Sequence, residues 1–152
     1  MITTLVATMV SAGAFKCAIT TEPQVAMSVD KKVKVVVLHD GQFTIQRTGT
    51  RYAKLVGQWS GFGHHQQVVM SRDGSAFAIY DRYAGMEVFD GKGKKIAFLE
   101  PRKVLNEKEM DGIPGKWTCH TEGTWLERPS FDFQKNRLEF TIYNGRKIRV
   151  DL

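Results

Sequence analysis

The stretch Phe77-Ala78-Ile79-Tyr80-Asp81, which follows the turn dipeptide Asp73-Gly74, decides the fold class of this chain. Large apolar residues alternate in it with small or polar ones, and this period of two is typical of a half-buried β-strand. The same aromatic-x-isoleucine pattern recurs beside a turn in Phe43-Thr44-Ile45-Gln46 and in Phe140-Thr141-Ile142-Tyr143-Asn144. Because strands joined by tight turns form hairpins, the sequence predicts an antiparallel all-β protein.

Further strands are expected beside the other turns of the chain. Their residue ranges are 33–38 with 43–47, then 54–56, 67–71 with 76–80, and 86–89 with 95–99. These runs are rich in β-branched and aromatic residues, which favour strands. We expect roughly seven to ten strands in a small sandwich, a barrel or a propeller-like meander of hairpins. At most one short helix is expected, near 101–110, where Pro101 precedes good helix formers.

In the last hairpin, the pattern of apolar and charged side chains predicts which residues pair across the two strands. A two-residue turn at Asn144-Gly145 would mix apolar and charged residues on both faces of the hairpin. A type I turn followed by Gly145 as a left-handed bulge residue shifts the pairing by one residue. That register makes one face wholly apolar and places opposite charges on the other, with the pairs Phe140–Ile148, Leu138–Val150 and Glu139–Arg149. We therefore predict the bulged three-residue loop.

Composition indicates a single folded domain. The chain has 152 residues, of which 42% are hydrophobic and 25% charged, and these values lie in the globular range. The net charge of +6 favours anionic partners such as nucleic acid, acidic polysaccharide or an anionic membrane face. Basic residues occur in scattered pairs rather than in a run, so a solvated surface is the simpler explanation. The sequence contains no convincing nucleic-acid signal.

The first residues resemble an export signal. Residues 2–15 carry no charge, and Ala12 and Ala14 fit the A-x-A pattern of signal-peptidase cleavage. A first strand or a disordered start is the alternative, and the apolar stretch is too short for a transmembrane span. We expect a signal peptide over 1–14, an irregular segment over 15–30 and one all-β domain over 31–152. Cys17 and Cys119 could then pair in an oxidising compartment, or remain two unconnected thiols.

The segment from Val68 to Ile96 combines a Ser-x-Asp-Gly turn at Ser71-Arg72-Asp73-Gly74 with the later turn Phe89-Asp90-Gly91-Lys92-Gly93. With the strands that flank these turns, about 30 residues (68–98) resemble one blade of an NHL or quinoprotein-type β-propeller. The resemblance implies a meander of antiparallel strands. Because the blade pattern is structural, it implies no functional residue, cofactor or partner.

Residues that could support catalysis or metal binding form no specific motif. His64 and His65 are adjacent, and adjacent strand residues point to opposite faces, so loop histidines are a simpler explanation than a metal site. Glu122 and Glu127 lie near tryptophans, as a glycosidase would need, but such proximity is common in a chain of this length. We therefore assign no catalytic residue, no metal ligand and no cofactor.

The aromatic residues in Gly-, Thr- and Ser-rich surroundings are the candidates for ligand contact: Trp59, Trp117, Trp125 and Tyr83. Exposed Trp and Tyr stack on sugars or anchor protein partners, whereas the alternative is that two of the tryptophans plug the ends of a sandwich or barrel. The sequence predicts a secreted, periplasmic or bacterial-envelope binding module without enzymatic activity, whose ligand is a glycan or an extracytoplasmic protein. A small polysaccharide-acting enzyme and a structural blade-like fragment are the alternatives.

Overall fold

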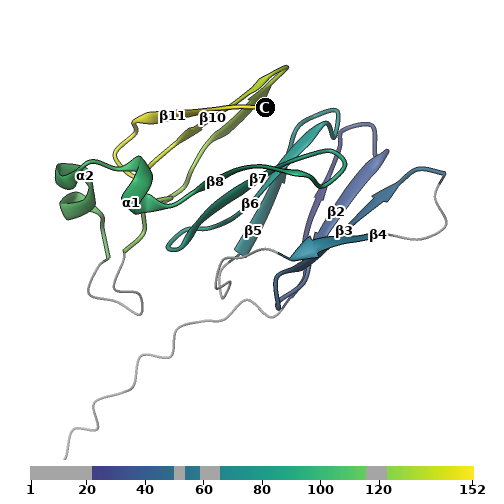
Figure 1. Cartoon of the computed structure of the whole chain (residues 1–152), viewed down its shortest axis with the longest axis horizontal. Coiled ribbons are helices and arrows are strands. Elements are labelled where there is room, and N and C mark those ends of the chain that lie inside the picture. Colours follow the sequence, from purple (N-terminus) through teal and green to yellow (C-terminus); the bar gives the residue numbers. More distant parts are fainter. Residues whose placement is uncertain (1–21, 50–53, 59–65, 116–122) are drawn as a thin grey trace, which may run out of the picture.

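The computed structural model describes residues 22–49, 54–58, 66–115 and 123–152, whose strands form three antiparallel sheets stacked face to face (Figure 1). The first sheet contains β1 (Gln24–Met27), β2 (Val33–Val37), β3 (Gln42–Arg47) and β4 (Lys54–Gln58) in that order. The middle sheet contains β5 (Gln66–Met70), β6 (Ala76–Asp81), β7 (Gly85–Asp90) and β8 (Lys95–Leu99). The third sheet has the order β11 (Lys147–Asp151), β10 (Arg137–Thr141) and β9 (Phe131–Gln134). The all-β prediction is confirmed, with more strands than expected and with no closed barrel among the described residues.

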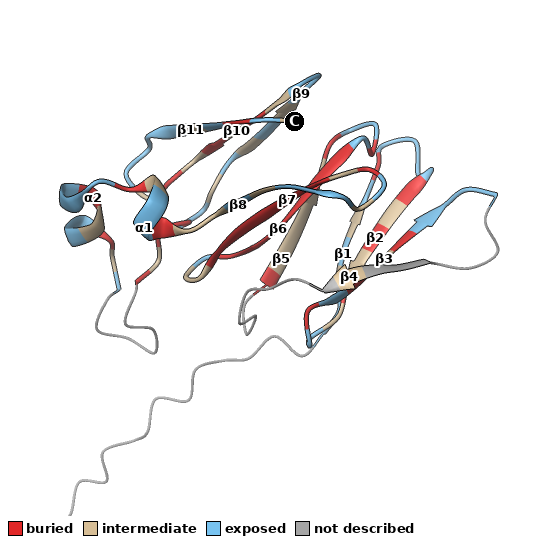
Figure 2. Ribbon diagram, viewed as in Figure 1, coloured by how far each residue is buried: buried red, intermediate tan, exposed pale blue. Residues whose placement is uncertain are grey.

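The middle sheet is covered on both faces, which explains why its central strands are so apolar. All six residues of β6 and five of the six residues of β7 are buried, and these two strands are red in Figure 2. Phe77 and Ile79 pack against the first sheet, whereas Ala78 and Tyr80 pack against the third. Alternate residues of a strand point to opposite faces, so β6 serves two cores at once.

The core between the first and middle sheets is built around three phenylalanine rings. Phe77 and Phe89 stack with their centroids 5.0 Å apart, and Phe43 of β3 meets Phe77 edge to face at 5.8 Å. Val33, Val35 and other buried aliphatic residues surround these rings. Such aromatic contacts stabilise beyond the area that they bury.

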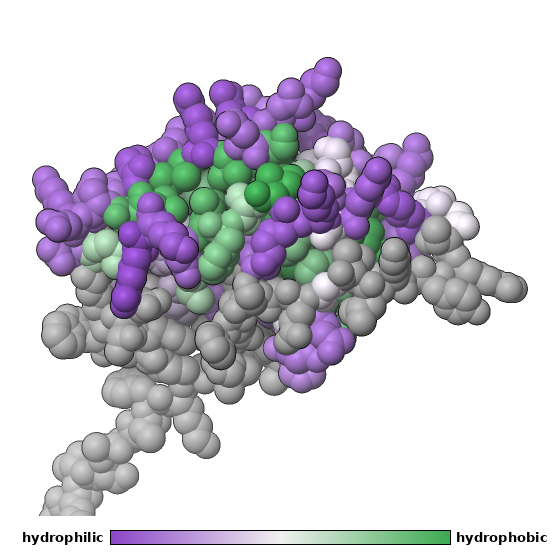
Figure 3. Space-filling model, in the orientation of Figure 1, coloured by the Kyte–Doolittle hydropathy of each residue, from purple (hydrophilic) through white to green (hydrophobic). Residues whose placement is uncertain are grey.

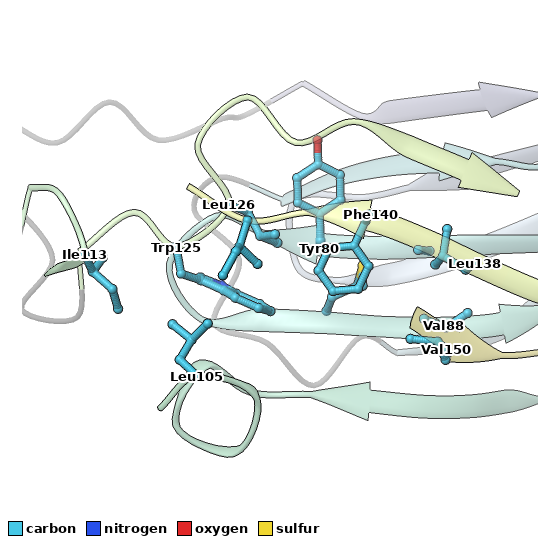
Figure 4. Packing of buried hydrophobic residues seen from close by; sticks show 12 residues of the cluster. Tyr80, Val88, Leu105, Ile113, Trp125, Leu126, Leu138, Phe140 and Val150 are labelled. Atoms are coloured by element: carbon cyan, nitrogen blue, oxygen red, sulfur yellow. The ribbon is translucent and has the colours of Figure 1, made fainter. Parts of the chain in front are cut away.

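The core between the middle and third sheets is larger and includes the segment that precedes β9. Figure 4 shows the Trp125 ring among Leu105, Leu126 and Tyr80, and Trp125 meets Phe140 edge to face at 6.3 Å. The Trp125 backbone links the two sheets, because its N–H donates to Arg82 O and its carbonyl accepts from Tyr143 N. In the space-filling view (Figure 3) apolar side chains gather near β8 and the third sheet, ringed by hydrophilic ones.

The register predicted for the last hairpin is confirmed. β10 and β11 pair Phe140 with Ile148, Leu138 with Val150 and Glu139 with Arg149. Gly145 has a φ of 84°, as the left-handed bulge position requires. On the outer face, Glu139 forms ion pairs with Arg149 at 3.0 Å and with Lys147 at 2.7 Å.

The expectation of at most one short helix near 101–110 is wrong, because two short helices occupy that region. α1 (Pro101–Val104) ends at Leu105, whose backbone is extended, and α2 (Glu107–Gly112) begins after Asn106. Asn106 and Glu109 form a reciprocal capping box, which starts a new helix. Glu109 also accepts two hydrogen bonds from Arg146, at 2.5 and 2.8 Å, and so ties α2 to the turn before β11.

The segment expected to be irregular, 15–30, contributes β1 to the first sheet. β1 pairs with β2 along its length, which places Val25 opposite Val36 and Met27 opposite Lys34. The expected signal peptide over 1–14 lies outside the described residues. No helix in the described part of the chain is both long and apolar enough to cross a bilayer.

Candidate functional site

The first and middle sheets share a turn of the same construction. In the turn between β1 and β2, Ser28 Oγ donates to Asp30 Oδ1 at 2.7 Å and accepts from Val33 N at 3.0 Å. In the turn between β5 and β6, Ser71 Oγ donates to Asp73 Oδ1 at 2.8 Å and accepts from Ala76 N at 3.0 Å. In both turns the aspartate also accepts from the backbone N–H two residues later, at 3.0 Å. The two sheets are therefore structural repeats at this edge.

One position of the repeated turn differs between the two sheets. The residue after the aspartate has a positive φ in both, 59° at Lys31 and 71° at Gly74. Glycine adopts this left-handed conformation without steric cost, whereas a residue with a Cβ pays about 1–2 kcal/mol. The first turn thus holds a lysine in a conformation for which the fold favours glycine.

The strained lysine belongs to a surface pocket of about 300 Å³ on the first sheet. We call it the Lys31 pocket; four cationic side chains, Lys31, Lys32, Lys34 and Arg47, line it with Met27 and Gln46. One cross-strand row on the outer face of the sheet consists of Met27, Lys34 and Gln46. It lies on the face opposite to the one that buries Val33 and Val35, because alternate residues of a strand point to opposite faces. The turn and the outer face of the sheet together build the pocket.

The charge of the Lys31 pocket is strongly positive. Lys32 forms an ion pair with Asp30 at 3.4 Å. Within the described residues Lys31 and Lys34 have no carboxylate partner. The hydrogen bond from the Ser28 hydroxyl, with that from Lys32 N, lowers the pKa of the Asp30 carboxyl. Several ammonium groups around a concave site attract anions.

Trp125, expected as a ligand contact, occupies the core position that was its alternative. Its side chain is 0% exposed and lies between the middle and third sheets. A ring in that place cannot stack on a ligand at the surface. Tyr83 is partly buried in the turn between β6 and β7, where its backbone N–H donates to Asp81 Oδ1 at 2.8 Å.

Most of the other residues singled out from the sequence lie outside the described residues: Trp59, Trp117, His64, His65, Glu122, Cys17 and Cys119. Glu127 lies exposed in the segment before β9. His39 lies exposed in the turn between β2 and β3. Among the described residues, no three His, Cys, Asp or Glu side chains come together as a metal site would need.

The pocket could have been found from the sequence by comparing turns rather than strands. Ser28-Val29-Asp30-Lys31 corresponds to Ser71-Arg72-Asp73-Gly74, and the substitution of Lys for Gly marks the site. The Phe-x-Ile stretch lies in the third strand of the first sheet, β3, but in the second strand of the middle sheet, β6, and this difference conceals the repeat. Comparison with protein-family models, with curated proteins and with solved structures finds no match for this chain.

Proposed function

We propose that this protein is a non-enzymatic binding module that acts outside the cytoplasm and holds an anionic ligand in the Lys31 pocket. The observation that carries the proposal is the left-handed backbone of Lys31, with φ at 59°, inside a pocket lined by three further cations. Strained residues persist where the surrounding structure holds them, and they concentrate at functional sites. A lysine where glycine would serve the fold better supports a role for its ammonium group.

The chemistry of the pocket favours binding over catalysis. No carboxylate, histidine or cysteine is among the described residues that line it. General acid–base and nucleophilic catalysis depend on such groups. The ligand we propose carries several negative charges, as an acidic glycan or an acidic protein surface does.

The extracytoplasmic location rests on the sequence of residues 1–14 and on the two cysteines. Intact mass spectrometry of the protein recovered from its native compartment tests it. Loss of residues 1–14, together with a two-hydrogen deficit relative to the reduced chain, is the expected result. A full-length chain with two free thiols would overturn the location and leave the pocket unaffected.

The variant Lys31→Gly tests the binding site, because it should raise the free energy of unfolding and lower the affinity for an anionic ligand. Removal of the left-handed strain should raise the free energy of unfolding by about 1 kcal/mol. Loss of the ammonium should weaken binding to dextran sulfate several-fold, while the charge-matched control Lys108→Gln on α2 should bind as the wild type does. Dextran sulfate binding that is unchanged by Lys31→Gly would exclude the pocket as the site.

We further propose that the sheets are arranged as neighbouring blades of a propeller are, which gives the chain a structural framework for binding. Face-to-face packing of the three sheets supports this. The first strands of the first two sheets, β1 and β5, also lie against each other.

A further inference from the structure

The two ends of the stack have different outer faces. The outer face of the third sheet is polar, because its apolar residues Leu138 and Phe140 point toward the middle sheet. Glu139 lies at the centre of that face, between the ion pairs to Lys147 and Arg149. The negative charge of Glu139 is balanced by these two cations, so the outer face of the third sheet is suited to contact with water.

The outer face of the first sheet combines cations with exposed apolar side chains. Met27 and Lys34 are cross-strand neighbours, and Val25 and Val36 form the next pair on the same face. Val25 is 51% exposed, Met27 46%, and Val29 at the adjoining turn 66%. These are three of the five large apolar side chains that are exposed in the described part of the chain, and they lie within five consecutive residues of the sequence. Apolar groups concentrated in this way beside lysines mark an interaction surface.

A second copy of the chain does not complement this surface. Pairing of two such faces about a two-fold axis would set the lysines of one copy against a surface with the same excess of positive charge, and like charges repel. Pairing with the outer face of the third sheet would meet Glu139 already neutralised by two cations. The complementary partner has to be anionic and also offer an apolar layer.

We infer that the outer face of the first sheet docks on an anionic lipid bilayer, an inference that rests on the function proposed above and names its partner. The lysines of the Lys31 pocket meet lipid phosphates at the level of the head groups. Val29 at the turn, with Val25 and Met27 beside it, enters the boundary of the acyl chains. A bilayer offers negative charge and an apolar layer at adjacent depths, and peripheral proteins use both.

Vesicle co-sedimentation with matched variants tests the inference. The wild type should sediment with vesicles of phosphatidylcholine and phosphatidylglycerol, and not with vesicles of phosphatidylcholine alone. The double variant Val25→Ser/Val29→Ser keeps every charge and should lose about tenfold in vesicle affinity, because it removes two partly inserted side chains. Ile96→Ser, which changes an exposed apolar residue of β8, is the control and should bind as the wild type does. Thermal unfolding followed by circular dichroism checks that each variant is folded.

Binding to soluble dextran sulfate separates this inference from the proposed function. Val25→Ser/Val29→Ser, which changes no residue of the pocket lining, should bind dextran sulfate as the wild type does, whereas Lys31→Gln/Lys34→Gln should lose both dextran sulfate and vesicles. Vesicle binding that survives Val25→Ser/Val29→Ser unchanged would overturn the docking mode and leave the anion site intact. A wild type that binds dextran sulfate but no anionic vesicle would overturn the bilayer as partner and favour an acidic glycan. Binding to neither would overturn both proposals.

Discussion

The first and middle sheets approach each other closely at the repeated turn. We therefore expect that one methyl group added there lowers the free energy of unfolding by a large amount. In the variant Gly74→Ala, the new Cβ would lie 2.7 Å from the Cβ and Cγ2 of Val33 and 3.4 Å from the Cβ of Ser28. Val33 is buried in the core between the sheets, so it cannot move aside without displacing β2. The φ of 71° adds about 1 kcal/mol for a residue with a Cβ, and the overpacked contact adds about 2 kcal/mol. We expect a total loss of about 3 kcal/mol in the free energy of unfolding.

Gly145→Ala is the matched control, because its loss in the free energy of unfolding comes from the positive φ alone and not from a close contact. Gly145 has a similar φ of 84°, but a Cβ there would meet no atom within 4 Å. Urea unfolding followed by circular dichroism should therefore show a loss of about 1 kcal/mol for Gly145→Ala, with the slope against urea unchanged in both variants. Equal losses in the two variants would refute the tight contact between the Gly74 turn and Val33.

Three further perturbations test the rest of the fold. Phe77→Ala should cost about 4 kcal/mol in urea unfolding, because it empties the centre of the three-ring core; a loss below about 1 kcal/mol would contradict that packing. Arg146→Ala should cost about 2 kcal/mol, since it removes two hydrogen bonds to the Glu109 carboxylate, and Arg146→Lys should restore only part of this. Hydrogen bonds from the Ser75 hydroxyl and N–H, and from Ser71, lower the pKa of Asp73 to about 2. The stability that Asp73 contributes is present above the unfolded pKa of about 3.9 and is lost as pH falls toward about 2; Asp73→Asn should flatten that part of a pH–stability curve, and an unchanged curve would contradict the shift.

The sequence predicted the local structure of this protein well because hairpins are encoded locally. Alternation of apolar and polar residues located the strands, and the parity of residues around Gly145 determined the register of the last hairpin. The break between α1 and α2 was missed, since it depends on the capping box of Asn106 and Glu109 within a helix-forming stretch. The strand β1 was missed because Val25 and Met27 are exposed and give no buried face to detect.

The arrangement of the sheets and the candidate site could not be predicted in the same way. How the sheets pack on one another depends on contacts between residues far apart in the chain, such as Phe43 of the first sheet with Phe77 of the middle sheet. Tryptophan in a Gly- and Ser-rich segment suggested surface exposure, but Trp125 fills a core that forms only when the third sheet packs on the middle one. The strand patterns do not indicate the Lys31 pocket, because its cations come from a turn and two strands; only comparison of its turn with Ser71-Arg72-Asp73-Gly74 marks it in the sequence.

The double coverage of the middle sheet also constrains how the chain unfolds. Detachment of either outer sheet would expose one complete apolar face of β6 and β7, so partly unfolded forms should be scarce and unfolding should be cooperative across all three sheets. Amide protons of β6 should then exchange with solvent only through global opening, whereas those of the edge strands exchange through local fraying. The middle sheet, through its buried central strands β6 and β7, thereby sets the lifetime of the folded state for the two sheets packed against it.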